Sequence, residues 1–139
     1  MSRIIKSSTP GKDREKLSKA IVITIRDFMQ QEAPDQSTKD MIAFITLALQ
    51  EIAAGIDNSV AAWEKRGYWV KADKYRLEWQ WTGEMSEKLK SAFSHEDWGS
   101  ITACLVEIME KFSKIKVSNQ HRMGKPWVNA YNNYNELVK

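Results

Sequence analysis

The 139-residue sequence contains only one cysteine, three prolines and six glycines. Because Cys104 stands alone, the chain cannot form an internal disulfide, which is typical of a reducing, cytoplasmic location. So few prolines and glycines favour long helices over a turn-rich all-β fold. The longest apolar run, residues 41–56, is interrupted by Gln50 and Glu51. It is shorter than the ~20 apolar residues of a membrane span, so we expect no membrane partner.

Catalytic and cofactor-binding motifs are also missing from the sequence. His95 and His121 are the only histidines, and neither follows a carboxylate by three residues as the histidines of di-iron bundles do. No glycine-rich phosphate loop occurs, and Cys104 has no second cysteine or basic pair beside it to lower the pKa of its thiol. We therefore expect no catalytic residue, no metal site and no cofactor.

Two carboxylate pairs have the i,i+3 spacing that metal sites in helical bundles use: Glu84 with Glu87, and Glu107 with Glu110. A carboxylate-metal hydrolase is therefore one alternative function. Three of these glutamates have a lysine four residues further on, which favours exposed ion pairs instead.

The remaining composition is that of an ordinary globular chain, with 28% charged and 42% hydrophobic residues. The net charge of +3 is too small by itself to indicate nucleic acid or an anionic membrane. Apolar residues recur at spacings of three and four, which predicts an all-α fold, an up-and-down bundle of four main helices plus a short C-terminal helix. We expect residues 1–12 to be a flexible basic N-terminal arm and residues 13–139 to form a single domain.

The predicted helices cover residues 13–32, 37–56, 60–81 with an extension to 92, 94–115 and 126–138. Residues 41–56 are apolar almost all round, which places their helix in the middle of the bundle. Ser37 with Asp40 and Ser94 with Asp97 are the predicted N-terminal caps of two helices. The last helix is predicted to begin at Pro126, a residue favoured in a first turn.

The boundary between the second and third predicted helices has two interpretations. Gly55 is followed by three residues that can cap a helix, which predicts a short loop at residues 55–59. The apolar spacing nevertheless continues through Ile52, Ile56, Val60 and Trp63. A single helix of about 45 residues therefore remains the alternative.

The most unusual stretch is residues 63–81, which holds four of the six tryptophans and two of the four tyrosines. On one continuous helix at about 100° per residue it carries two apolar stripes. The first stripe, which we assign to the core, comprises Val60, Trp63, Gly67, Val70, Leu77, Trp81 and Met85. The second stripe comprises Tyr68, Ala72, Tyr75 and Trp79, and Lys65 and Lys71 flank it.

One buried stripe cannot contain both sets, so the second stripe with its two lysines is our candidate interaction surface. Because Trp and Tyr are enriched at protein contacts, the leading hypothesis is a non-enzymatic protein that binds another protein or itself. Single-stranded nucleic-acid binding through the basic N-terminal arm and this stretch is the second hypothesis, since aromatic side chains stack on bases and lysines contact phosphates. Acidic residues interleave with the basic ones here, which argues against it.

Overall fold

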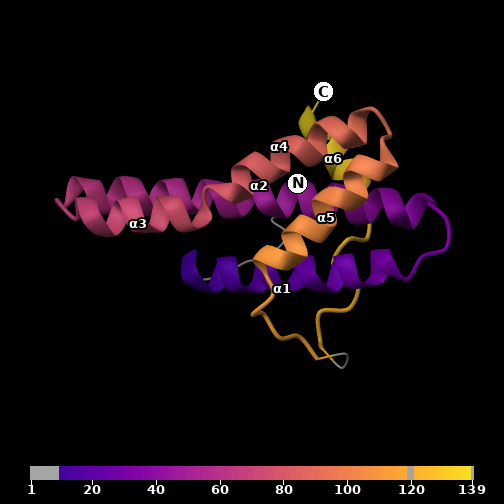
Figure 1. Cartoon of the computed structure of the whole chain (residues 1–139), viewed down its shortest axis with the longest axis horizontal. Helices are drawn as coiled ribbons and strands as arrows, with labels where there is room; N and C mark the ends of the chain where they lie inside the picture. Colours follow the sequence, from indigo (N-terminus) through magenta and orange to yellow (C-terminus); the bar gives the residue numbers. More distant parts are fainter. Residues whose placement is uncertain (1–9, 119–120, 139) are drawn as a thin grey trace.

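A computed structural model describes residues 10–118 and 121–138 of the chain (Figure 1). These residues form only helices and connecting segments, so the predicted all-α bundle with a short C-terminal helix is confirmed. The helices are α1 (Pro10–Met29), α2 (Gln36–Lys65), α3 (Trp69–Trp79), α4 (Trp81–Ser94), α5 (Trp98–Lys111) and α6 (Ala130–Val138). Residues 1–9 of the predicted N-terminal arm lie outside the described residues, and residues 10–12 belong to α1 rather than to an arm.

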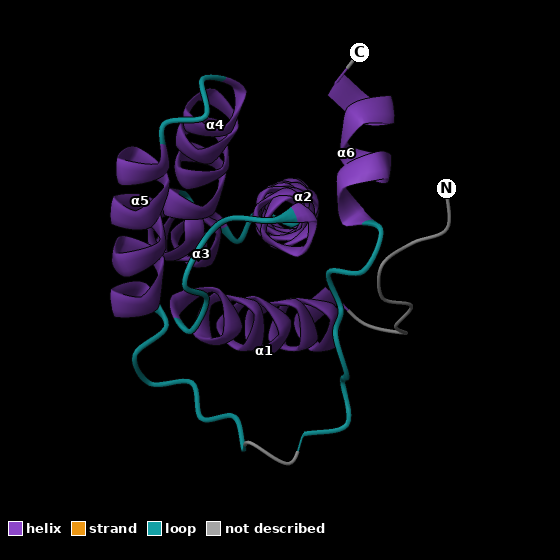
Figure 2. Cartoon of the chain, turned by 90° about the vertical axis from the view of Figure 1, so that its right-hand side faces the viewer, coloured by secondary structure: helices purple, strands orange, loops and turns teal. Residues whose placement is uncertain are grey.

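Helix α2 is the central element of the molecule. Figure 2 shows it end-on, with α1, α4 and α6 around it and α5 outside α4. All nine residues from Met41 to Leu49 are buried, as the apolar composition of this segment predicts. Each large apolar side chain that is fully buried contributes about 1.5–3 kcal/mol, so this segment supplies much of the driving force for folding.

Helix α1 is buried on more than one side along residues 20–25, all six of which are buried. It packs on α2, and α5 also contacts it. The segment after α5 then passes below α1 in Figures 1 and 2, where Arg26 Nη2 donates a hydrogen bond of 2.9 Å to the carbonyl of Val117. The helix ends at Met29 rather than at residue 32, because residues 30–35 form the turn into α2.

The start of α2 differs from the prediction by two residues. Asp35, not Ser37, is the N-cap, and its carboxylate accepts a hydrogen bond of 3.0 Å from the backbone N–H of Thr38. The Thr38 hydroxyl accepts in return from the Asp35 N–H at 2.9 Å, which completes a capping box. Asp40 has a different role, because its carboxylate accepts a hydrogen bond of 3.0 Å from the backbone N–H of Tyr131 in α6.

The predicted cap of α5 at Ser94 is also wrong. Ser94 is the last residue of α4, and its hydroxyl donates to the Ser91 carbonyl at 2.8 Å. Asp97 is the N-cap instead, accepting from the Ser100 N–H at 3.1 Å. The apolar face of α5 is formed by Ile101, Leu105 and Ile108, which are all buried, and Phe112 just after the helix is buried as well.

The C-terminal helix begins at Ala130, four residues later than predicted, because residues 126–129 form a turn. Its described apolar face docks on the bundle, with Ala130 and Tyr134 buried and Trp127 buried just before it. The Phe93 ring of α4 lies 5.5 Å from the Tyr134 ring, centroid to centroid. Three asparagines give α6 a low helix propensity, so this helix gains its stability from tertiary contact.

Helix α2 passes straight through the predicted loop at residues 55–59, so that boundary is wrong. The continuous alternative is also wrong, because the helix ends at Lys65 after 30 residues, about 45 Å at 1.5 Å per residue. Ile52, Ile56 and Val60 are all buried, so the core contacts extend past Gly55. An interior glycine reduces helix stability by only about 1 kcal/mol, which these contacts exceed.

Candidate interaction surface on the α2–α3 arm

The last turns of α2 and the whole of α3 form a two-helix arm, residues 60–79, that projects from the body of the molecule (Figure 1). The chain reverses at Gly67, whose φ of 82° is in the left-handed region that glycine tolerates best. Gly67 N–H donates to the Glu64 carbonyl at 3.0 Å and Tyr68 N–H donates to the Trp63 carbonyl at 2.9 Å. This pair of hydrogen bonds is a Schellman motif, which ends α2 at the tip of the arm.

The inward face of α3 consists of Ala72, Tyr75 and Trp79. Ala72 is 0% exposed against α2, and the Tyr75 ring lies 4.9 Å from the Trp63 ring, centroid to centroid. Arg14 of α1 reaches the same face, because its guanidinium lies 5.4 Å from the Tyr75 ring centroid and 4.9 Å from that of Trp79. Arg14 also donates a hydrogen bond to the Tyr75 hydroxyl. The arm is therefore held to the body at its base by stacking between a cation and aromatic rings.

The six residues of the predicted interaction surface do not share one face. Ala72, Tyr75 and Trp79 pack against other helices of the same chain, and the stacked Trp79–Trp81 rings are 6.4 Å apart. Tyr68 lies outside any helix, at the tip, and is exposed together with Lys65 and Lys71. The assumption of one unbroken helix through residues 60–85 is wrong, since α2 ends at Lys65 and α3 ends at Trp79. The predicted extension to residue 92 is a separate helix, α4, which begins after the α3–α4 junction at Gln80.

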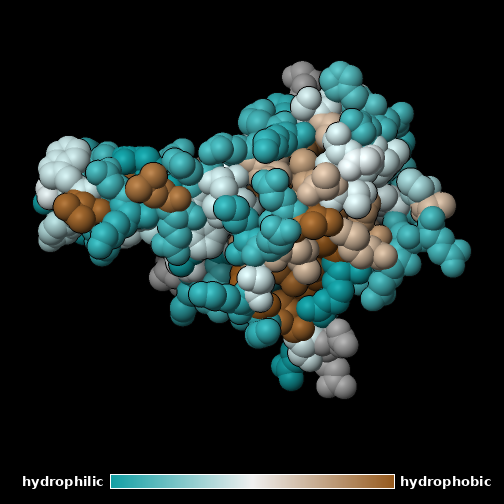
Figure 3. Space-filling view, in the orientation of Figure 1, coloured by the Kyte–Doolittle hydropathy of each residue, from teal (hydrophilic) through white to brown (hydrophobic). Residues whose placement is uncertain are grey.

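The outward face of α3 carries the apolar residues that the sequence assigned to the core. Val70 is 70% exposed and Leu77 is 69% exposed. Figure 3 shows exposed hydrophobic patches, in brown, on the arm. Trp69, at 59%, and Tyr68, at 54%, are exposed at the tip beside Val70. The assignment failed because the turn at Gly67 changes the angular relation between Trp63 and every residue of α3.

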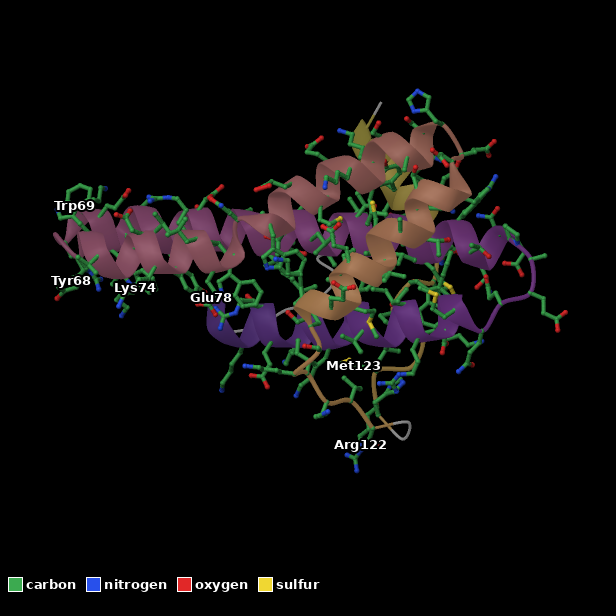
Figure 4. The ribbon with its side chains drawn as sticks, viewed as in Figure 1. Tyr68, Trp69, Lys74, Glu78, Arg122 and Met123 are labelled. Carbon is green, nitrogen blue, oxygen red and sulfur yellow. The ribbon has the colours of Figure 1, made fainter. Side chains whose placement is uncertain are left out.

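Ion pairs neutralise part of the charge on the arm. The Arg76 guanidinium contacts the carboxylates of Glu64 and Asp73 at 2.6 Å each, and these bonds, Glu64 first, raise the pKa of Arg76 above its usual value. Lys71 extends over the Trp63 ring, with Nζ 4.4 Å from the centroid. Figure 4 labels Lys74 and Glu78, two further exposed charges of opposite sign on α3. Arg76 therefore pairs with two acids of the arm, Glu64 and Asp73, whereas the lysines of the arm remain exposed.

In comparisons with known proteins, no family model, no curated protein and no solved structure matches this chain. The function is therefore inferred from the geometry and chemistry of the arm. Among the helices that the structure describes, none has the length and apolar character needed to cross a membrane.

The other candidate residues are dispersed over the surface. The four glutamates of the two predicted carboxylate pairs are exposed. Within residues 10–118 and 121–138, no three histidine, cysteine, aspartate or glutamate side chains are grouped closely enough to hold a metal ion. His95 follows the last turn of α4, and His121 lies in the segment before α6. Burial, and secondarily the nearby Glu107, raise the pKa of the Cys104 thiol, which makes it a weaker nucleophile at neutral pH.

The sequence did contain a signal for the arm that the periodicity analysis missed. Gly67 directly follows two basic residues, Lys65 and Arg66, and glycine just after a helix is typical of its C-terminal end. Gly55 was preferred because capping residues follow it. The position of Arg14 against α3 had no local signal, since the two residues it stacks on are about 60 positions away in the chain.

Proposed function

We propose that this protein is a non-enzymatic helical-bundle protein that binds another protein, or a second copy of itself, through the outward face of its arm. The observation that carries the proposal is the exposure of Val70 and Leu77, at 70% and 69%, on a helix whose inward face is already occupied. Large aliphatic side chains that are this exposed on a projecting element are typical of interaction sites. Trp69 and Tyr68 add the aromatic side chains that commonly dominate binding energy.

The magnitudes are consistent with a small interface that has a few dominant residues. Fully burying an aliphatic side chain contributes about 1.5–3 kcal/mol, so covering Val70 and Leu77 yields roughly 3 kcal/mol together after allowing for the part already buried. A specific complex needs more than this, because association itself opposes binding by at least about 4 kcal/mol. The contact must therefore include Trp69 or Tyr68 or the charges beside them.

A photo-reactive amino acid tests the proposal directly. We would introduce benzoylphenylalanine in place of Leu77, and in place of Val128 as a matched control, because Val128 is also apolar and 59% exposed but lies outside the arm. Irradiation in cells is expected to produce discrete protein adducts from position 77 that are absent from position 128. Identical adducts from both positions, or none from position 77, would contradict the proposal.

Single-stranded nucleic acid is the second candidate partner, and one observation favours it. Because Arg76 engages Glu64 and Asp73, the exposed Tyr68 and Trp69 lie among lysines whose charge is little offset. Bases could stack on these rings while the lysines contact phosphates. Fluorescence anisotropy with a labelled oligonucleotide should then show binding that weakens steeply between low and physiological salt. No binding at low salt removes this candidate.

A further inference from the structure

We propose that a cavity between α1, α2 and α3 binds a small organic cation, an amine attached to a short apolar group. The cavity has a volume of about 300 Å³ and lies beside the base of the arm, where Figure 1 shows the first turns of α1 below the arm. This volume is at the lower end of the range for ligand sites, so the ligand is small. The site is separate from the outward face of the arm, because Val70 and Leu77 do not line it.

Gly55 opens the wall that α2 contributes to this cavity. It lies inside α2, and a Cβ added there would meet nothing within 4 Å. Neither a left-handed backbone nor the close approach of another helix therefore requires glycine at this position, although glycine makes the interior of a helix less stable than alanine does. A side chain at residue 55 would occupy space in the cavity. A ligand that needs this space accounts for the glycine, since folding alone favours a larger residue.

The apolar part of the lining indicates the body of the ligand. Leu17 of α1 lines the cavity together with Ile52 and Ile56 of α2, and Tyr75 of α3 lines it as well. An apolar group placed against these side chains displaces water from them, which favours binding. A metal ion would use none of these contacts and would leave most of the cavity unfilled. The lining therefore favours an organic ligand over a metal ion.

The polar part of the lining indicates the charge of the ligand. Asp13 of α1 and Glu51 and Asn58 of α2 line the cavity. A carboxylate has about four lone-pair sites, so each of these two can accept from a ligand in addition to the contacts that it makes within the chain. Among the described residues of the lining, Arg14 alone is basic, and it already stacks on the Tyr75 ring and donates to its hydroxyl. Two acids with one engaged base favour a cation, and the three acceptors suit the three N–H donors of a primary ammonium group.

Three probes of similar length test the chemical class of the ligand: hexylamine, hexanol and hexanoate. In proton–nitrogen correlation spectra, hexylamine should shift the Gly55 amide signal with a Kd at least about tenfold lower than that of hexanol, because it forms hydrogen bonds with charged groups. Hexanoate should bind more weakly than hexanol. The amides of Gly99 and Gly124, which lie outside the lining, are the internal control.

Several results of this titration would overturn the proposal. These are the absence of any Gly55 shift, equal affinity for hexylamine and either other probe, equal shifts at the control glycines, and a Gly55 shift produced by calcium ions alone. The first removes the site, the second and the last remove the organic cation, and the third shows that binding is not localised.

Replacing one carboxylate tests whether the lining itself binds the amine. Glu51→Gln should weaken hexylamine binding roughly tenfold and leave hexanol binding unchanged. Asp57→Asn is the matched control, because it removes one negative charge from the same helix at an exposed position outside the lining. An equal loss in the two variants would mean that only the overall charge attracts the amine, and the site would be wrong.

Filling the cavity tests its location independently. In Gly55→Leu the new side chain occupies the cavity, so hexylamine should no longer shift the backbone amide of Asn58. The same substitution at Gly11, which is exposed in α1 with nothing within 4 Å of an added Cβ, should leave binding unchanged. Undiminished binding by a folded Gly55→Leu variant overturns the assignment of the cavity. If that variant does not fold, as judged by circular dichroism, the comparison of Glu51→Gln with Asp57→Asn decides.

Discussion

Tyr75 and Leu77 occupy opposite faces of α3, and replacing each with alanine tests which face is the core. The half-buried Tyr75 ring packs against Trp63 at 4.9 Å and stacks with Arg14 at 5.4 Å, and its hydroxyl accepts a hydrogen bond from Arg14. Leu77 is 69% exposed. A single continuous helix would have given the opposite arrangement, with Leu77 buried.

The expected loss for Tyr75→Ala is the sum of three contributions. Partial burial of the ring contributes about 1 kcal/mol and the aromatic contact with Trp63 about another 1 kcal/mol. The stacking and hydrogen bond with Arg14 contribute about 1–2 kcal/mol together. The higher helix propensity of alanine offsets about 0.5 kcal/mol, which leaves a loss of about 3 kcal/mol. Leu77→Ala should change the free energy of unfolding by less than about 0.5 kcal/mol.

Urea unfolding followed by circular dichroism measures both variants, at a protein concentration low enough to prevent self-association. With a slope of about 1–3 kcal/mol per molar urea, Tyr75→Ala should lower the midpoint by about 1–3 M. Tyr75→Phe retains the ring and should lose only about 1 kcal/mol, the share of the hydroxyl. If Leu77→Ala is as destabilising as Tyr75→Ala, the inward face has been assigned incorrectly.

Three further outcomes are expected from the local geometry. Gly67→Ala should lose about 1 kcal/mol of stability in urea, because φ is 82° at this position. Gly55→Ala should instead gain about 0.5–1 kcal/mol, because Gly55 lies inside α2 and an added Cβ meets nothing within 4 Å there. The hydrogen bonds from Ser100 hold the pKa of Asp97 below the usual value for an aspartate. The stability that Asp97 contributes is therefore present above that usual value and disappears as the pH falls through the lower pKa of the folded state, so Asp97→Asn should show less acid sensitivity in that range. Cys104 should react with Ellman's reagent more slowly at pH 8 than a free cysteine does, because burial raises the pKa of its thiol, and an equal rate would contradict this.

The elements that could be predicted from the sequence are those whose apolar residues dominate their surroundings. Residues 41–49 are apolar on every side, so only a position enclosed by other helices suits them, and α2 occupies it. The face of α5 formed by Ile101, Leu105 and Ile108 is equally clear, because its spacing continues without a break and Glu107 and Glu110 lie on the opposite side. Helix ends were less predictable, since several serines and aspartates near each end could act as caps.

The candidate surface was predictable only in part. Two apolar sides of residues 69–79 could be read from the helical spacing, and both exist, but the sequence assigned the wrong side to the core. Tyr75 and Trp79 are inward because Trp63 and Arg14 lie there, and these neighbours come from α2 and α1. Nothing within the eleven residues of α3 distinguishes one apolar side from the other.

The sequence by itself therefore determined that the chain is helical, that residues 41–49 lie at its centre, and that α3 has two apolar sides. The tertiary structure alone decided where the long central helix turns back and which side of α3 meets solvent. The physical reason is that helical periodicity relates side chains only while the backbone remains helical. After the left-handed turn at Gly67, the orientation of α3 depends on contacts with residues distant in sequence.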